Sequence, residues 1–459
     1  MKTEYLGLDD ISGSLAVING IDGASYDEIV DITLENDERR TGRIIEVTKD
    51  FSVILIFESA KNISLTNTRT KLTGKPFALP LSKEILGRTF DGIGRPLDGL
   101  GPVFAECERD INGSPINPVS REYPNSFIQT GVSSIDCLMT LIRGQKLPIF
   151  SGNGMPHDKL AVQIATQAKI KNAENDNFAI VFAAMGVKHD VADFFTSAFK
   201  KNGAADRSVM FINTSSDPVA QRILTPRCAL TTAEYLAFNH DMHVLVIMTD
   251  ITSYCEAVRE ISSSKQEIPS RKGYPGYLYS DLASIYERAG IIKTSTGSVT
   301  MIPILTMPND DITHPIPDLT GYITEGQIVL DRVLHRKNIY PPISVLPSLS
   351  RLMKDGIGEG FTRSEHPDIA NQLFSSYSYV QDVRALASVI GEDELSDRDK
   401  IYMKFGFEFE NSFIKQEYNE NRSIDKTLEL AWDILKTLPQ NELTRISPEI
   451  MKKKYFKED

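Results

Sequence analysis

Long apolar runs are missing from this sequence. No segment approaches the roughly 18 uninterrupted apolar residues that a membrane-spanning helix requires. The first ten residues, MKTEYLGLDD, also lack the apolar core of a secretory signal peptide. We therefore expect a protein that is neither inserted in a membrane nor exported, and that works in the cytoplasm.

Cysteine is scarce and scattered. Four cysteines form neither a close pair nor a C-x-x-C motif, which is typical of reduced, buried thiols in a cytosolic chain: Cys107, Cys137, Cys228 and Cys255. His240 and His243 form an H-x-x-H, but the residues around them do not complete a recognisable set of metal ligands. The sequence therefore predicts no metal site.

An excess of positive charge is also missing. Fifty Lys and Arg against 62 Asp and Glu give a formal net charge of -12 at pH 7. This sign of charge repels a phosphate backbone, so nucleic acid is excluded as the chief partner. A chain of 459 residues with 41% hydrophobic and 24% charged residues is ordinary globular protein. At roughly 150 residues per domain, it predicts about three domains.

Short strands with turn residues between them dominate the start of the chain. The expected strands cover residues 14–18, 29–34, 42–47 and 52–57. This spacing predicts a small closed β-barrel over residues 1–75. The segment 87–102 is rich in glycine and proline, which predicts a connecting loop.

The pattern changes in the central region, which we assign to residues 76–359. Helical periodicity in residues 158–171 and 278–289 alternates with apolar runs that are typical of strands buried on both faces, at residues 147–150, 178–185, 208–212, 243–250 and 298–305. Such alternation predicts an α/β fold with a doubly wound parallel sheet, which binds ligands at the carboxyl ends of its strands.

Helical spacing takes over after about residue 360. One helix face is marked by apolar residues at Ile424, Leu428, Ala431, Leu435 and Leu438. The sequence therefore predicts a C-terminal helical bundle over residues 360–459.

A glycine-rich turn follows the first buried strand of the central region and precedes a predicted helix. This is the place of a phosphate-binding loop, and it is occupied by Ser151, Gly152, Asn153 and Gly154. A working loop ends in Gly-Lys-Ser/Thr, because the glycine exposes backbone N–H groups, the lysine reaches the terminal phosphates and the hydroxyl holds magnesium. In this chain those three places hold Pro156, His157 and Asp158.

Each of these three replacements opposes ATP binding. Pro156 has no N–H to donate, and His157 is largely neutral at pH 7. Asp158 puts a carboxylate near the phosphate oxygens, a repulsion of order 4 kcal/mol for unit charges about 4 Å apart at an effective dielectric near 20. The alternative is an ordinary strand-to-helix turn with Asp158 or a neighbour as a cap. Asp250, which ends another buried strand, is either the carboxylate that holds magnesium or a cap.

Four longer strings are more specific than any single motif: GRTFDGIGRPLDG, QTGVSSIDCL with RGQKLPIFSGNGMPH, PSRKGYPGYLYSDLA and HPIPDLTGYITEGQI. In this order they closely resemble the non-catalytic B subunit, or beta chain, of V/A-type rotary ATPases, and the likeness runs essentially from end to end. The resemblance implies an N-terminal β-barrel, a central RecA-like domain with a degenerate P-loop and a C-terminal helical domain.

The resemblance also implies a role in a complex. In this family three B subunits alternate with three catalytic A subunits in an A3B3 ring around a central stalk rotor, with peripheral stalk subunits outside the ring. ATP or ADP with Mg would bind at the A–B interface, mainly to the A subunit, and this chain would need no cofactor of its own. Its role would be regulatory, in a complex on the cytoplasmic face of a membrane that couples ATP synthesis or hydrolysis to proton or sodium transport.

Relatives that hydrolyse ATP carry a glutamate that orients the attacking water. After the second buried strand, where that glutamate would follow a glycine, this chain has Gly186, Val187 and Lys188. The resemblance therefore implies that the chain does not turn over ATP alone.

The segment PPISVLPSLSRL resembles a signature shared by alpha and beta chains of rotary ATPases. Ser348 and Ser350 occupy its serine positions and are candidate interface residues, and Ser344 stands where Asp, Asn or His is usual. Arg351 aligns with the arginine finger that this subunit inserts into its neighbour's site. A planar, permanently charged guanidinium that pairs with the γ-phosphate oxygens increases turnover about a thousand-fold to a hundred-thousand-fold in phosphotransferases. The alternative is an ordinary surface or interface salt bridge.

A second transferred feature is the segment EDELSDRDK. It resembles the acidic helix-turn-helix that faces the rotor in rotary ATPases, and its candidate contact residues are Glu392, Asp393, Glu394 and Asp397. The alternative is a solvated charged turn.

Two other functions are compatible with the RecA class. An autonomous hexameric motor, such as an export ATPase or an RNA translocase, is opposed by the missing lysine, hydroxyl and glutamate and by the negative net charge. A pure binding module without any part in catalysis differs from the rotary ATPase subunit described above only in the role of Arg351.

Overall fold

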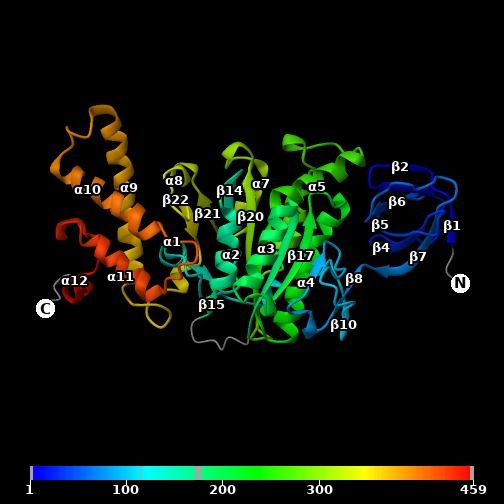
Figure 1. Cartoon of the computed structure of the whole chain (residues 1–459), viewed down its shortest axis with the longest axis horizontal. Coiled ribbons are helices and arrows are strands. Elements are labelled where there is room, and N and C mark those ends of the chain that lie inside the picture. The colour runs from blue at the N-terminus through cyan, green and yellow to red at the C-terminus, as the bar shows by residue number, and fades with distance from the viewer. Residues whose placement is uncertain (1–3, 114, 171–176, 455–459) are drawn as a thin grey trace. The chain divides into compact units, whose positions relative to one another are not determined.

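The computed structural model describes residues 4–113, 115–170 and 177–454, and Figure 1 colours the chain by residue number. Two compact units are formed, and each combines segments that are distant in sequence. The first contains Met1–Asn117 and Ala179–Arg288, and the second contains Pro118–Phe178 and Ala289–Asp459.

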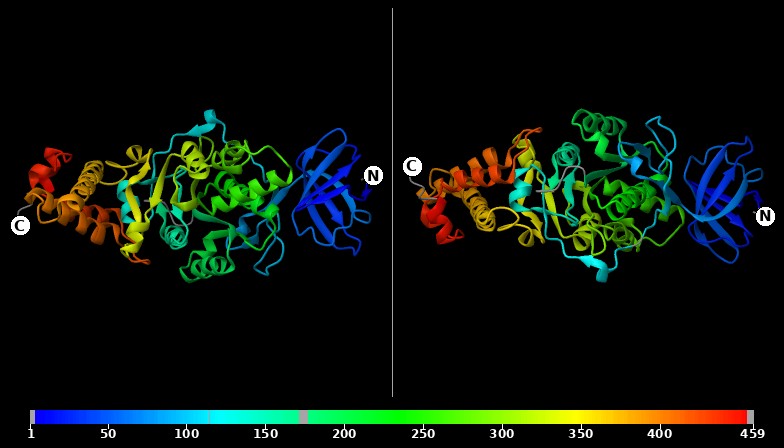
Figure 2. Two further views of the ribbon diagram at one scale, coloured as in Figure 1. Left: turned by 90° about the horizontal axis from the view of Figure 1, so that it is seen from above. Right: turned by 90° about the horizontal axis from the view of Figure 1, so that it is seen from below.

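The first unit begins with an antiparallel sheet of seven strands in the order β1-β7-β4-β5-β6-β3-β2. Alternate side chains such as Val30, Ile32 and Ile54 meet in one apolar cluster, around which the strands curve as a barrel (Figure 2). Strands β1 and β2 form its edges and are not paired with each other in the part of the chain described, so the predicted barrel is present but its closure is incomplete. The strands are β1 (Glu4–Leu6), β2 (Asp10–Ser12), β3 (Leu15–Asn19), β4 (Glu28–Thr33), β5 (Arg39–Val47), β6 (Phe51–Ile56) and β7 (Arg69–Pro76).

The segment 87–102, which we expected to be a connecting loop, contains a strand. Strand β9 (Thr89–Asp91) pairs in parallel with β17 (Ser208–Thr214). The buried ring of Phe90 stacks on Phe211 with the ring centroids 5.3 Å apart. The loop prediction is wrong here, because burial against a strand far away in the sequence outweighs the local glycine and proline content.

The rest of the first unit contains a sheet portion in the order β18-β16-β17-β9, with parallel pairing of β16 with β17 and of β17 with β9. Its other strands are β16 (Phe178–Val187) and β18 (His243–Thr249), and β8 (Ala78–Leu81) forms a separate antiparallel pair with β10 (Cys107–Asp110). Helices alternate with these strands as predicted: α3 (His189–Lys201), α4 (Val219–Asn239), α5 (Ile251–Ser264) and α6 (Leu278–Tyr286).

The second unit contains a sheet portion in the order β22-β21-β14-β20. Strand β14 (Ile149–Gly152) runs parallel to β20 (Ser298–Met307) and to β21 (Gly326–Leu330), whereas β22 (Ile343–Ser350) runs antiparallel to β21. The parallel α/β architecture is confirmed, and β21 and β22 are additions that periodicity did not predict. Shorter strands are β11 (Arg121–Glu122), β12 (Phe127–Gln129), β13 (Leu141–Ile142), β15 (Lys169–Ile170) and β19 (Gly290–Ile292).

Helices of the second unit include α1 (Ser133–Leu138), α2 (His157–Gln167), α7 (Pro315–Ile323) and α8 (Arg332–Arg336). Helix α2 corresponds to the helix predicted over 158–171. It ends earlier because the chain enters β15, and the predicted end, Lys171, lies outside the described residues.

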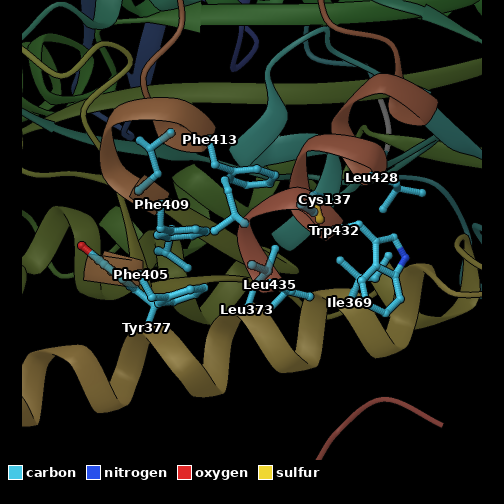
Figure 3. Close-up of a cluster of buried hydrophobic side chains, with 14 of the residues drawn as sticks. Cys137, Ile369, Leu373, Tyr377, Phe405, Phe409, Phe413, Leu428, Trp432 and Leu435 are labelled. Carbon is cyan, nitrogen blue, oxygen red and sulfur yellow. The ribbon is translucent and has the colours of Figure 1, made fainter. Parts of the chain in front are cut away.

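The C-terminal helical prediction is confirmed. Phe405, Phe409 and Phe413 lie along one line of stacked rings, in the same buried cluster as Trp432 and side chains of α9 (Figure 3). The five apolar residues predicted to share one face, from Ile424 to Leu438, are all buried. The elements are α9 (His366–Ile390), α10 (Asp397–Glu408), a π-helical segment (Phe409–Ile414), α11 (Ile424–Leu435) and α12 (Pro448–Lys454).

All four cysteines are free thiols, as predicted. Cys137, Cys228 and Cys255 are buried and Cys107 is half-buried. Burial raises the pKa of Cys228 to about 12, so this thiol is unreactive at neutral pH. Among the described helices, none is long and apolar enough to cross a membrane.

Candidate functional site

The degenerate phosphate-binding loop lies where the sequence predicts it, between β14 and α2. Ser151 and Gly152 end the buried strand, and Gly154 turns the chain with a φ of 75° toward the helix. The hydroxyl of Ser151 is 2.9 Å from Nδ1 of His157, whose Nε2 is 3.6 Å from Oδ1 of Asp158. These contacts bring the predicted residues together. The side chains of Ser151, His157 and Asp158 thereby contact one another.

An ion pair that sequence reasoning missed lies at the mouth of this loop. Arg332, at the start of α8, donates from Nε to Oδ2 of Asp310 at 2.7 Å and from Nη2 to Oδ1 at 2.8 Å. The same Nη2 also donates to the backbone carbonyl of Asn153 at 3.0 Å. The guanidinium holds the pKa of Asp310 below its usual value, so both partners are charged at neutral pH.

Gly152 shows how closely this pair approaches the loop. A Cβ atom at Gly152 would lie only 2.1 Å from Oδ1 of Asp310, so only glycine fits beneath that carboxylate. A phosphate entering the loop would meet Asp310 and Asp158, while the nearby cation of Arg332 is already bonded to Asp310 and to a carbonyl. The arrangement favours a closed loop without bound phosphate.

Asp250 belongs to the first unit, where it caps a helix. It precedes α5, and its Oδ1 accepts a hydrogen bond from the backbone N–H of Thr252 at 2.8 Å. This is the capping role that was one of the two alternatives for Asp250.

The end of β16 holds the Gly186-Val187-Lys188 segment that replaces a water-orienting glutamate. Gly186 has a φ of 66°, and a Cβ atom there would lie 2.6 Å from Nε of Arg222. That Nε donates to Oδ1 of Asn213 at 3.1 Å, and Asn213 also accepts from the N–H of Gly186 at 3.0 Å. The strand end is therefore packed against a cation, and Val187 and Lys188, the residue before α3, offer no carboxylate.

Arg351 follows directly after β22 and is exposed. Its backbone N–H donates to the carbonyl of Glu325 at 2.9 Å, and its Nη1 donates to the carbonyl of Thr324 at 3.2 Å. Within residues 4–113, 115–170 and 177–454, no carboxylate forms an ion pair with this guanidinium. A surface salt bridge within the chain, one form of the alternative for Arg351, is therefore absent from the described part of the chain, whereas an interface salt bridge stays open.

The antiparallel direction of β22 decides at which end of the neighbouring strands Arg351 lies. Ser350 pairs with Gly326 at the beginning of β21, whereas the phosphate-binding loop follows the carboxyl end of the parallel strand β14. From the level of Glu325 to the loop is roughly 20 Å along the strands, at about 3.3 Å per residue. The Arg351 side chain therefore cannot reach the loop of its own chain.

The hydroxyls of Ser348 and Ser350 bind β22, the strand that precedes Arg351, to neighbouring segments. The hydroxyl of Ser348 accepts the N–H of Val329 at 2.8 Å, at a bulge where the β21–β22 ladder shifts register. The hydroxyl of Ser350 donates to the carbonyl of Thr140 at 3.0 Å and accepts from Nε2 of Gln145 at 2.8 Å. Both hydroxyls thus have partners within the chain.

Thr140 itself is supported by a buried acid in α1. Its Oγ1 donates to the carbonyl of Asp136 at 2.8 Å. The Asp136 carboxylate accepts the N–H and the hydroxyl of Thr130 and the N–H of Gly131, at 2.7 to 2.9 Å. Burial nevertheless raises the pKa of Asp136 to about 7. The support of the Arg351 strand therefore includes a group that sequence reasoning did not single out.

The acidic segment connects α9 to α10, as the predicted helix-turn-helix requires. The buried side chain of Leu395 anchors it, and Ser396 caps α10 by accepting the N–H of Asp399 at 3.2 Å. Just before it, Val389 is 83% exposed at the end of α9. The four candidate contact residues all lie on the surface of this turn: Glu392, Asp393, Glu394 and Asp397.

Comparisons with known proteins agree with this architecture. The sequence model of the ATP synthase alpha/beta family, nucleotide-binding domain, matches residues 131–350, and that of the C-terminal domain of V and A type ATP synthase matches residues 355–456. A solved structure of the ATP synthase subunit NeqB from Nanoarcheaum equitans is 43% identical, with a TM-score of 0.73, and the match covers 90% of this chain and 100% of that one.

Full-length relatives have the same name in several organisms. The V-type ATP synthase beta chain 2 of Clostridium tetani is 62% identical, and the V-type ATP synthase beta chain of Thermotoga neapolitana is 59% identical, each over 99% of both chains. Identity at this level over the whole length covers the loop, the β22 strand and the helical end. The chain therefore belongs to the ATP synthase alpha/beta family and, within it, to the V-type ATP synthase beta chains.

Proposed function

We propose that this chain is the non-catalytic, regulatory subunit of a V/A-type rotary ATPase, and that Arg351 acts as an arginine finger at the site of a neighbouring catalytic A subunit. The observation that carries the proposal is that the exposed Arg351 guanidinium has no carboxylate partner in the described residues and lies at the sheet edge away from its own loop. A charge held in this way is available to a γ-phosphate outside the chain.

The proposed chain does not hydrolyse ATP alone. Asp310 and Arg332 fill the mouth of the loop, and Val187 and Lys188 follow Gly186 at the end of β16, where a catalytic relative has a glutamate after the glycine. ATP or ADP with Mg would bind at the A–B interface, mainly to residues of the A subunit. Arg351 is then the catalytic residue that this chain contributes in trans.

The test uses the ring assembled from this chain and its A partner. We expect Arg351→Ala to lower ATP turnover by at least about a thousand-fold, because the developing charge on the γ-phosphate loses its guanidinium. Arg445→Ala, which removes another exposed arginine, should leave turnover unchanged. Size-exclusion chromatography must show that both variant rings assemble, and near-normal turnover in an assembled Arg351→Ala ring would refute the finger.

The same reagents separate the two other candidate functions. An autonomous RecA-type motor, for export or RNA translocation, would hydrolyse ATP as the purified chain alone. A pure binding module would assemble with the A partner, but the ring that contains it would hydrolyse ATP no faster than the ring that contains the Arg351→Ala variant. Activity only in the mixture, and only with Arg351, supports the proposed role.

We also propose that the turn between α9 and α10 faces the central stalk rotor. Its acids are exposed together with the apolar side chain of Val389, so the turn offers both charge and contact area. Figure 1 shows the turn joining α9 to α10. A cysteine at Glu394 should cross-link to one specific site on the rotor, whereas one at the exposed Glu35 of the barrel should not. A merely solvated turn would give no specific product.

The remaining parts of the proposal concern the whole complex. Its ring is A3B3, with a central stalk and peripheral stalk subunits, and it couples ATP synthesis or hydrolysis to proton or sodium transport. The complex lies on the cytoplasmic face of the membrane, without membrane insertion of this chain. The proposed domains of the chain are the barrel over residues 1–75, the RecA-like domain over 76–359 and the helical domain over 360–459.

A further inference from the structure

Glu325 and Arg351 lie opposite each other, just beyond the end of the β21–β22 ladder. The ladder ends with the pairing of Gly326 with Ser350. One position further, the N–H of Arg351 donates to the carbonyl of Glu325 at 2.9 Å. Side chains of opposite residues in an antiparallel pair lie on the same face, with Cβ atoms about 4.5–5.5 Å apart. A carboxylate and a guanidinium in these positions are therefore well placed to form an ion pair.

The carboxylate of Glu325 binds Lys146 instead. Its Oε2 accepts the backbone N–H of Lys146 at 2.8 Å, and its Oε1 lies 2.9 Å from Nζ of the same lysine. The backbone N–H of Glu325 also donates to the carbonyl of Lys146 at 3.1 Å. Both carboxylate oxygens of Glu325 thus have a partner in one residue that is not Arg351.

Burial explains why Glu325 binds Lys146 rather than Arg351. The side chain of Lys146 is only 4% exposed, whereas Arg351 is exposed. A buried ammonium is strongly destabilising unless a counter-charge lies close to it, whereas an exposed guanidinium is hydrated and gains little from an ion pair. The carboxylate of Glu325 therefore stabilises the fold most when it faces Lys146.

The segment that carries Lys146 is held by β20. Met301 of that strand donates its N–H to the carbonyl of Gln145 and accepts the N–H of Leu147, both at 2.9 Å. The side chain of Gln145 reaches β21 as well, since its Nε2 donates to the carbonyl of Glu325 at 3.1 Å. Because hydrogen bonds fix the backbone on both sides of Lys146, this residue has a defined place beside Glu325.

We propose that Lys146 is a positioning residue for Arg351, because it holds the carboxylate of Glu325 away from the guanidinium. The charge of Arg351 then remains available to the γ-phosphate at the neighbouring site. This inference rests on the proposed function of Arg351. Lys146 itself does not touch nucleotide and acts only through Glu325.

The first variant, Lys146→Met, removes the ammonium and keeps the backbone N–H and the approximate length of the side chain. The carboxylate of Glu325 loses this counter-charge and can pair with the guanidinium of Arg351 opposite. In the assembled ring we expect kcat to fall about tenfold, with the KM for ATP within about twofold of the wild-type value. The reason is that the carboxylate competes for the guanidinium and also repels the charge that develops on the γ-phosphate.

The double variant Lys146→Met/Glu325→Gln separates positioning from structural support. It also removes the carboxylate that competes for Arg351, so kcat should return to within about threefold of the wild-type ring. If Lys146 only supported the fold, the double variant would be no more active than Lys146→Met. Lys337→Met, which breaks the ion pair of another lysine with Glu410, is the control and should leave turnover unchanged.

Assembly of each ring is checked by size-exclusion chromatography. If the Lys146→Met ring does not assemble, Lys146→Gln takes its place, and failure of both would make Lys146 a structural residue and overturn the proposal. An assembled single variant with normal kcat, or a double variant without recovery, overturns the role of Lys146 even where Arg351→Ala abolishes turnover. Normal turnover of the Arg351→Ala ring would instead overturn the arginine finger, and the role of Lys146 with it.

Discussion

Arg332 and Arg351 follow two neighbouring strands, β21 and β22, yet their guanidinium groups have different partners. Arg332 makes two hydrogen bonds to Asp310 and one to the carbonyl of Asn153. Arg351 makes one, to the carbonyl of Thr324, and forms no ion pair with a described carboxylate. The charge of Arg332 is therefore neutralised inside the chain, and that of Arg351 is not.

Strand direction explains why the two arginines differ. Strand β21 runs parallel to β14, so its carboxyl end leads Arg332 to the edge where the phosphate-binding loop lies. Strand β22 returns antiparallel and delivers Arg351 to the opposite edge, beside Glu325. Neighbouring strands of opposite direction thus place one arginine beside the loop and the other at the far end of the strands, without an ion pair in the described residues.

The largest expected effect comes from replacing the guanidinium of Arg351. In the assembled ring, Arg351→Lys keeps the charge but loses the planar fork that pairs with two phosphate oxygens. We expect a loss of roughly a hundred-fold or more in turnover, against roughly a thousand-fold or more for Arg351→Ala. Steady-state hydrolysis with saturating ATP measures both. Full activity of Arg351→Lys would mean that a point charge suffices and that the fork is unimportant.

The second prediction tests what holds α1, the helix behind the Arg351 strand. His366 of α9 lies 2.9 Å from the carbonyl of Cys137 through Nε2 and 3.0 Å from the hydroxyl of Thr362 through Nδ1. Burial lowers the pKa of His366 to about 4 from an ordinary 6.5. The unfolded chain therefore takes up a proton at a higher pH than the folded one, so stability is complete above about pH 6.5 and is lost as the pH falls toward 4.

Urea unfolding followed by the fluorescence of Trp432, the only tryptophan, measures this loss. Between pH 7 and 4.5 His366 should contribute a decrease of about 2–3 kcal/mol, at about 1.4 kcal/mol per pKa unit. Trp432 lies in the same buried cluster as Cys137 (Figure 3), so it reports on this region. His366→Gln, which keeps a donor but cannot titrate, should show a smaller decrease. An equal decrease in both proteins would contradict the assignment to His366.

The third prediction concerns Ser350, the residue before Arg351, whose hydroxyl holds the end of β22. Ser350→Ala removes the donor to Thr140 and the acceptor for Gln145, at a cost of about 1–2 kcal/mol in unfolding free energy. Because Ser350 positions Arg351 without touching nucleotide, kcat of the ring should fall about tenfold with an unchanged KM. Ser388→Ala removes an exposed hydroxyl and serves as the control. A change in stability with unaltered kcat would leave Ser350 a purely structural residue.

Local patterns in the sequence predicted what depends on near neighbours. The alternating strands of the barrel, the strand-loop-helix around Gly154 and the apolar face from Ile424 to Leu438 all follow from periodicity and turn residues. The resemblance to rotary ATPase subunits supplied the hypothesis for Arg351, which stays a prediction. Periodicity could not supply β22, because a mixed strand of exposed and buried residues with an internal proline has no clear period.

Contacts between distant segments were not predictable in this way. Arg332 and Asn153 are joined only after β14 and β21 pair, and neither residue has a local signal that points to the other. The same reason explains why the local sequence of β9 predicts a loop, since Phe90 is ordered by Phe211 on another strand. The hydrogen bonds of Ser348 and Ser350 to other segments were likewise not predictable, and the place of these two residues at an interface stays a prediction.

The smallest expected effect comes from opening the closed loop. Asp310→Ala should change the unfolding free energy by no more than about 1 kcal/mol, because the pair with Arg332 is largely exposed. It also removes one of two carboxylates near the loop and frees Arg332, so the affinity of the isolated chain for a fluorescent ATP analogue should rise about tenfold. Binding should remain weak, since Pro156 and Asp158 are still present. Asp206→Ala, an exposed acid in the first unit, controls for net charge. Equal affinity of the two variants would show that Asp310 is not what closes the loop, and the contrast between Arg332 and Arg351 would then depend on Pro156 and Asp158 alone.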